Sequence, residues 1–127
     1  MKNLQTFEEF LNESIDDSII KGSEIIAQNK GLSKSEDGSS FINPNAKFEL
    51  ITIPTLSVNN KGQYSWYVKR GLDEDVYMID QLIDKIKSGV KLHPIVLDKD
   101  MKILDGNHRF VAYRKLRIKE IKVYKEI

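Results

Sequence analysis

The sequence predicts an α+β fold, a compact domain in which a small mixed sheet packs against helices. Strand-like and helix-like patterns follow one another after residue 41 in the order strand, helix, strand, strand, helix, strand. The connections between them are short, as expected within one domain. A length of 127 residues with 40% hydrophobic content suits a single domain with a modest core.

Each element has its own local signal. Alternating β-branched residues predict a strand at 48–53, ended by Pro54. A helix is predicted at 75–88, where Asp73 or Asp75 is the expected cap and Gly89 the end. Its apolar stripe consists of Val76, Ile79, Leu82, Ile83 and Ile86. Short strands at 93–98 and 101–105 flank a turn at Lys99 and Asp100, and a helix at 108–116 precedes a final strand at 121–127.

Residues 1–40 are predicted to form a helical N-terminal extension and a polar linker, followed by the compact domain at 41–127. Thr6 and Glu9 have the spacing of a capping box that begins a helix at 7–13. Apolar pairs at 19–20 and 25–26 suggest a second helical stretch. The segment 30–40, KGLSKSEDGSS, is polar and rich in turn-forming residues, as in linkers and loops.

Composition excludes several classes of site. The chain has no cysteine, which removes disulfides, thiolate nucleophiles and cysteine-ligated metals. Two histidines are too few for an all-histidine metal site, so any metal is expected to be Mg²⁺ held by carboxylates and a ligand phosphate. No apolar run approaches the ~20 residues of a membrane-spanning helix, and no secretory signal is recognisable, so we expect a cytoplasmic protein without a membrane partner.

Charge is spread unevenly along the chain. Residues 1–50 carry five Lys or Arg and nine Asp or Glu, whereas residues 99–127 carry nine Lys or Arg and four Asp or Glu. Duplex DNA binding requires a broad basic face. A local anion site in the basic C-terminal part is therefore favoured over a nucleic-acid surface.

The most informative stretch is Asp-Gly-Asn-His-Arg at 105–109, where a predicted strand runs into a predicted helix. The first turn of a helix presents unsatisfied N–H groups and a positive dipole end, and Gly106 allows a tight turn and close approach of a ligand. Arg109 offers a planar fork for phosphate oxygens and His108 a titratable donor. Asp105 would hold Mg²⁺ or accept a proton. An ordinary turn, with Asn107 as helix cap and Arg109 solvated, explains the same residues and stays open.

The stretch HPIVLDKDMKILDGNHRFVAYRKLRIKEIKVY resembles the signature half of the ParB/sulfiredoxin superfamily, and the similarity covers about residues 48–127. The resemblance implies nucleotide binding, with phosphates at Gly106, Asn107, His108 and Arg109. Sulfiredoxin activity is excluded, because its cysteine is replaced by Asn107. Partition ParB proteins have a different loop and a following helix-turn-helix domain, so centromere binding is excluded as well.

The loop is closest to the Asp-Gly-His-His-Arg of free serine kinases. That similarity implies ATP or another NTP with Mg²⁺ as cofactors, and an NTP-dependent phosphotransferase or NTPase acting on an unknown second substrate. Asp105 and His108 are the expected catalytic residues, and Asp105 the metal ligand. The alternatives are a non-catalytic protein that binds a host protein or nucleic acid through its basic C-terminal end, and a ParB-like nuclease. Arg117 stands where the superfamily usually has a glycine ending the helix.

Other residues carry weaker signals with two interpretations each. The acids Asp73, Glu74 and Asp75 would supply a metal ligand or simply cap their helix. The cations Lys69 and Arg70 would reach a phosphate or be solvated. The aromatic residues Tyr64, Trp66 and Tyr67 would stack on a base or be buried, and His93 is expected to begin a buried strand.

The N-terminus, MKNLQTFEEFLNES, resembles the short capsid-targeting peptides of T-even-like bacteriophages, which are cleaved after Leu/Ile-x-Glu. Leu11-Asn12-Glu13 fits that rule. The resemblance implies a phage protein that is packaged in the phage head, delivered to the bacterial host and cleaved after Glu13. An ordinary packed helix is the alternative.

Overall fold

The computed structural model describes residues 18–28, 42–59 and 71–127. The predicted helix at 7–13, the linker at 30–40, the aromatic residues 64–67 and the pair Lys69-Arg70 lie outside the described residues. The described elements, in chain order, are β1 (Ile19–Lys21), α2 (Gly22–Gln28), β2 (Lys47–Pro54), the short 3-10 helix η2 (Thr55–Ser57), α5 (Asp73–Lys87), β3 (Ile95–Leu97), β4 (Ile103–Asp105), α6 (Asn107–Lys115) and β5 (Glu120–Glu126).

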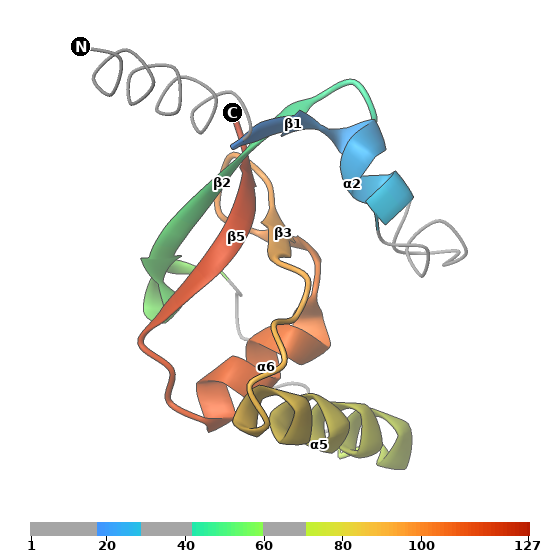
Figure 1. Ribbon diagram of the computed structural model, residues 1–127, viewed down its shortest axis with the longest axis vertical. Coiled ribbons are helices and arrows are strands. Elements are labelled where there is room, and N and C mark those ends of the chain that lie inside the picture. Colours follow the sequence, from blue (N-terminus) through green and yellow to red (C-terminus); the bar gives the residue numbers. More distant parts are fainter. Residues whose placement is uncertain (1–17, 29–41, 60–70) are drawn as a thin grey trace, which may run out of the picture.

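The strands form one mixed sheet in the order β1-β2-β5-β3-β4 (Figure 1). β2 and β5 make its long antiparallel centre, with register from Phe48 opposite Glu126 to Pro54 opposite Glu120. β3 runs parallel to β5, and β4 returns antiparallel to β3. The predicted α+β class with a small mixed sheet is therefore confirmed.

The predicted strand at 48–53 extends by one residue at each end, to Lys47 and Pro54. Proline is tolerated there because β1 pairs only with residues 47–49 of β2. At Pro54, β2 therefore pairs with β5 only. The absence of a proline N–H thus removes no hydrogen bond of the sheet. The turn at Lys99 and Asp100 is also confirmed, with the Asp98 carboxylate accepting N–H bonds from Asp100 and Lys102 at 2.8 and 2.9 Å.

The expectation of a helical stretch at 19–20 is wrong, because these residues form β1 and pair with Phe48 and Glu49. The helix α2 starts only at Gly22. Ile25 of α2 is fully buried and packs in one cluster with Phe48 and Val96. Residues 18–28, expected in the N-terminal extension, thus contribute to the sheet and its core, while the division of the chain at residue 40 stays a prediction.

The two main helices, α5 and α6, lie side by side, and α6 also contacts β3 (Figure 1). Helix α5 begins two residues before the predicted 75, and its N-cap is Leu72 without a side-chain hydrogen bond, so capping by Asp73 or Asp75 is wrong. Val76 is 40% exposed rather than part of the buried stripe, whereas Ile79 is buried against Val111 and Ala112 of α6. None of the helices in the described ranges has the length and apolar character needed to cross a membrane.

Strand β3 has core on both of its faces. Ile95 and Leu97 contact the cluster that includes Phe110 of α6, while Val96 contacts the cluster of α2 and β2. All three β3 residues have no exposed surface. A strand covered on both sides gives the turn after β4, and the start of α6 that follows it, a rigid base.

Candidate functional site

The turn from β4 into α6 depends on Gly106. Its φ of 107° lies in the left-handed region that side chains disfavour, and it is the N-cap of α6. A Cβ at this position would stand 3.0 Å from Cγ1 of Ile95 and 3.1 Å from Nε of Arg109. The N–H of Phe110 donates to the Gly106 carbonyl at 2.9 Å, which closes the first turn of the helix. Both backbone conformation and space therefore require glycine.

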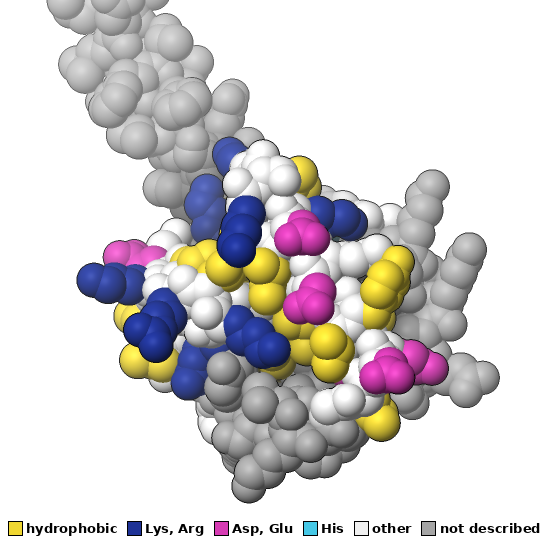
Figure 2. Space-filling model, turned by 90° about the horizontal axis from the view of Figure 1, so that it is seen from below, with side chains coloured by type: hydrophobic (Ala, Val, Ile, Leu, Met, Phe, Trp, Pro, Cys, Tyr) yellow, Lys and Arg dark blue, Asp and Glu magenta, His cyan; other side chains and the backbone are white. Residues whose placement is uncertain are grey.

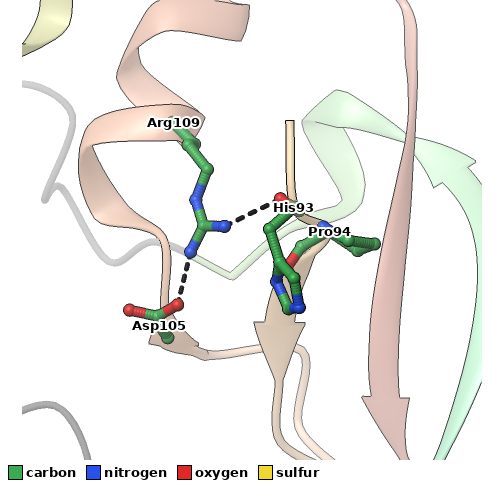
Figure 3. A network of polar contacts seen from close by, with 4 residues as sticks. All are labelled: His93, Pro94, Asp105 and Arg109. Atoms are coloured by element: carbon green, nitrogen blue, oxygen red, sulfur yellow. Dashed lines mark hydrogen bonds and ion pairs between the residues drawn. The ribbon is translucent and has the colours of Figure 1, made fainter. Parts of the chain in front are cut away.

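The Arg109 side chain lies close to this glycine. It reaches between Asp105, the last residue of β4, and His93, which precedes β3 (Figure 3). Its Nη1–H donates to the carbonyl oxygen of His93 at 2.8 Å, and its Nη2 forms an ion pair with Oδ2 of Asp105. The side chains of Arg109 and Asp105 are only 12% and 18% exposed. The guanidinium thus ties α6 to β4 and to the segment before β3, and it is not solvated as the ordinary-turn interpretation expected.

His93 is held in one tautomer by its neighbour. Because the Pro94 carbonyl can only accept, His93 Nδ1 is the protonated nitrogen that donates to it at 3.1 Å. Burial, reinforced by the charge of Arg109, lowers the pKa of His93 below its usual 6.5, so the ring is neutral at pH 7. Nε2 is consequently an acceptor, and it is buried with no hydrogen-bond partner among the described residues.

His108, in the first turn of α6, contacts the first turn of α5. Its Nε2 lies 2.7 Å from Oδ1 of Asp75, and Asp75 is only 6% exposed. A buried carboxylate that accepts from one ring nitrogen orients the imidazole and leaves Nδ1 as the other functional atom. The His108 side chain itself remains 28% exposed.

Asn107 is the first residue of α6 and not its cap, because Gly106 takes that position. Its Oδ1 is buried and has no hydrogen-bond partner within the described part of the chain. An unsatisfied buried amide oxygen is costly unless a donor reaches it. The start of α6 therefore contains a buried amide oxygen to which none of the described residues donates a hydrogen bond.

The predicted residues 105–109 thus lie together at one end of α6, as their adjacency in the sequence ensures. Two further participants were not predicted in these roles, the carbonyl of His93 and the carboxylate of Asp75. Asp75 had been expected as a helix cap or a metal ligand, and only the packing of α5 on α6 reveals His108 as its partner. The backbone role of His93 has no signal in the sequence at all.

The charges at the site are largely balanced inside the protein. Asp105, the expected metal ligand and base, is paired with Arg109, and Asp75 is hydrogen-bonded to His108. In the described ranges, no three side chains of the types His, Asp or Glu come together as a metal site. A Mg²⁺ ion bound with a nucleotide needs only one or two carboxylates, since phosphates and water supply the other ligands.

Anion binding at this end of α6 would rest on backbone donors. The N–H groups of Asn107, His108 and Arg109 precede the first closed turn, and Gly106 has no side chain with which to cap them. The positive end of the helix dipole adds to their attraction for an anion. The arrangement can therefore seat phosphate oxygens, with His108 and its carboxylate partner beside them.

No model of a protein family matches the chain, and a search of curated proteins found no match. Among solved structures, the chain is similar to two structures of a pNOB8-like ParB N-domain. The identities are 16% and 18%, the TM-score is 0.47 for both, and each match covers 62% of this chain. The chain spans only 30% and 27% of the lengths of those two chains. At this level the likeness concerns the fold alone and assigns no activity.

Proposed function

We propose that this is a ParB-like protein that binds ATP or another NTP, with its phosphates at the start of α6. The observation that carries the proposal is the left-handed Gly106, which opens a helix whose first N–H groups have no side chain to cap them. Phosphate binding at such helix starts is general chemistry. The resemblance of residues 48–127 to the ParB/sulfiredoxin superfamily supports the same ligand class.

The chemistry that we propose is phosphoryl transfer or NTP hydrolysis, with His108 as the base. Nε2 of His108 donates to Asp75, so Nδ1 is the atom that would take the proton from an attacking hydroxyl or water. Mg²⁺, when bound with the nucleotide, would neutralise phosphate charge, and Asp105 is the residue proposed to contact it. For Asp105 to do so, its ion pair with Arg109 must loosen.

The proposal is tested by calorimetry with ATP, CTP and GTP in the presence of Mg²⁺, comparing Asn107→Asp with the natural chain. A carboxylate at residue 107 repels phosphates, so nucleotide affinity should fall by about tenfold or more. Asn45→Asp is the matched control, because it makes the same charge change on an exposed residue outside the site. Equal affinities of the two variants would refute phosphate binding at α6, provided circular dichroism shows both folded.

Catalysis is tested separately by His108→Gln. If His108 is the base, turnover should fall by about 10²–10⁴-fold while the nucleotide Kd stays within about threefold. Release of inorganic phosphate or a diphosphate measures turnover. Loss of turnover without loss of binding supports the role of His108, whereas full turnover in His108→Gln excludes it.

One observation favours a second candidate, a binding protein that does not turn over nucleotide. Arg109 and Asp105 form an ion pair with one another, so in this structure neither side chain faces a reacting group. For this candidate, we expect nucleotide to raise the melting temperature of the protein with no phosphate released. The same titrations therefore separate the two functions.

A further inference from the structure

The other end of α6 carries a groove that the proposed nucleotide site does not involve. It has a volume of about 600 Å³ and lies between the end of β2 and the loop from α6 to β5. A volume of this size accommodates several side chains of a ligand. The cationic groove, as we name it, is lined by Pro54, Thr55, Leu56, Arg114, Arg117, Ile118 and Lys119.

The two walls of the cationic groove are fixed to one another by Thr55. Its Oγ1–H donates to the carbonyl of Ile118 at 2.5 Å, and its N–H donates to the carbonyl of Lys119 at 2.8 Å. Thr55 is only 2% exposed, so these bonds are shielded from water. A groove held in this way exists before a ligand arrives, which lowers the entropy cost of binding.

The lining combines positive charge with apolar surface. Three of the seven residues are Lys or Arg and none is Asp or Glu, while Leu56 at the rim is 78% exposed. Figure 2 shows dark-blue Lys and Arg side chains gathered around yellow hydrophobic ones on one half of the face seen from below. A ligand that matches this lining carries both negative charge and an apolar group.

Arg117 occupies a position where the backbone itself favours glycine. Its φ is 56°, and the N–H groups of Arg117 and Ile118 both bond back into the last turn of α6 at 3.1 Å. Helix α5 ends with the same bonds from Gly89 and Val90, and there the left-handed residue is a glycine. The backbone geometry at the end of α6 therefore does not explain an arginine, and Arg117 is one of the residues that line the groove.

We propose that the cationic groove binds an acidic peptide segment of a partner protein, with an apolar side chain of that segment against Leu56 and Ile118. Charge complementarity carries the choice of occupant, since carboxylates can pair with the side-chain cations of Arg117 and Lys119. A nucleic acid fits less well. None of the described residues that line the groove is aromatic and could stack on a base, and a phosphodiester backbone has no apolar group to place against Leu56 and Ile118.

The test is fluorescence anisotropy of the full chain with a labelled synthetic peptide of about 12 residues that alternates Glu and Ser around two central Leu residues. Arg117→Gly removes a groove cation and places a glycine at a positive φ, so we expect the variant to fold, which circular dichroism checks. We expect it to weaken peptide binding by about 3- to 10-fold. Lys47→Thr is the matched control, because it removes one positive charge at the opposite end of β2.

Further variants of the protein and of the peptide test the apolar and the charged contacts separately. Leu56→Ser should weaken binding, as should replacing the peptide's Leu residues by Ala or its Glu residues by Gln. Absence of peptide binding, or equal affinities of Arg117→Gly and Lys47→Thr, would overturn the proposal. Tighter, Arg117-dependent binding of a single-stranded oligonucleotide of equal charge would overturn it in favour of nucleic acid. Neither outcome depends on whether α6 binds nucleotide at its other end.

Discussion

The two ends of helix α6 share a left-handed backbone conformation but place very different residues in it, a glycine at the start and an arginine at the end. Each end turns through a left-handed residue, Gly106 with φ 107° at the start and Arg117 with φ 56° at the end. At the start, a Cβ would crowd Ile95 and Arg109, so glycine is required. At the end, glycine would be favoured, yet arginine is present. Gly106 is therefore required by the fold, whereas the backbone at residue 117 does not require an arginine.

The two ends of α6 also differ in how their cationic side chains are placed. Arg109 at the start is buried and balanced by Asp105, so its charge is used within the protein. The cations at the end line an open groove, and none of the described residues lining that groove is Asp or Glu. Buried ion pairs mainly position the backbone, while a cluster of cations on a surface attracts anionic ligands.

The largest effect of a substitution is expected at Arg109. Arg109→Leu leaves the Asp105 carboxylate and the His93 carbonyl without their donor, and we expect a loss of about 2–4 kcal/mol in unfolding free energy. Urea denaturation followed by circular dichroism measures it. Adding Asp105→Asn should recover on the order of 1 kcal/mol, because no unpaired buried charge then remains. A double variant as unstable as the sum of both single variants would contradict the pairing.

Gly106→Ala is expected to have the next largest effect. The alanine combines a disfavoured φ with contacts of 3.0–3.1 Å, and together they should cost about 2–3 kcal/mol of stability. Gly89→Ala is the control, since its φ is 85° and a Cβ there meets nothing within 4 Å, for a cost of about 1 kcal/mol. Equal losses in thermal or urea unfolding would mean that space around Gly106 is not limiting.

The smallest effect, of opposite sign, is expected at Arg117. Arg117→Gly should stabilise the fold by about 0.5–1 kcal/mol, because glycine adopts a positive φ without steric cost. Arg117→Ala keeps the backbone cost and should change stability by less than about 0.5 kcal/mol. Differential scanning calorimetry of both variants checks the order. If Arg117→Gly is destabilising, the arginine contributes to the fold and the contrast between the helix ends disappears.

Three features could be predicted from the sequence alone: the α+β class, the order of strands and helices after residue 47, and the position of residues 105–109 at the start of a helix. These features are local, because hydrophobic periodicity and turn residues act over a few positions. The prediction was wrong for Ile19 and Ile20, whose helix-like spacing is overridden by pairing with β2. Short apolar runs do not distinguish strand from helix until a neighbouring strand is present.

The partners of the site residues, in contrast, depend on how distant segments pack together. His108 contacts a carboxylate 33 positions away, and Arg109 contacts a carbonyl 16 positions away, because α5 packs on α6 and the segment before β3 passes beneath its first turn. The cationic groove likewise joins the end of β2 to the loop after α6. Such contacts depend on packing between distant segments, for which a single sequence contains no periodic signal.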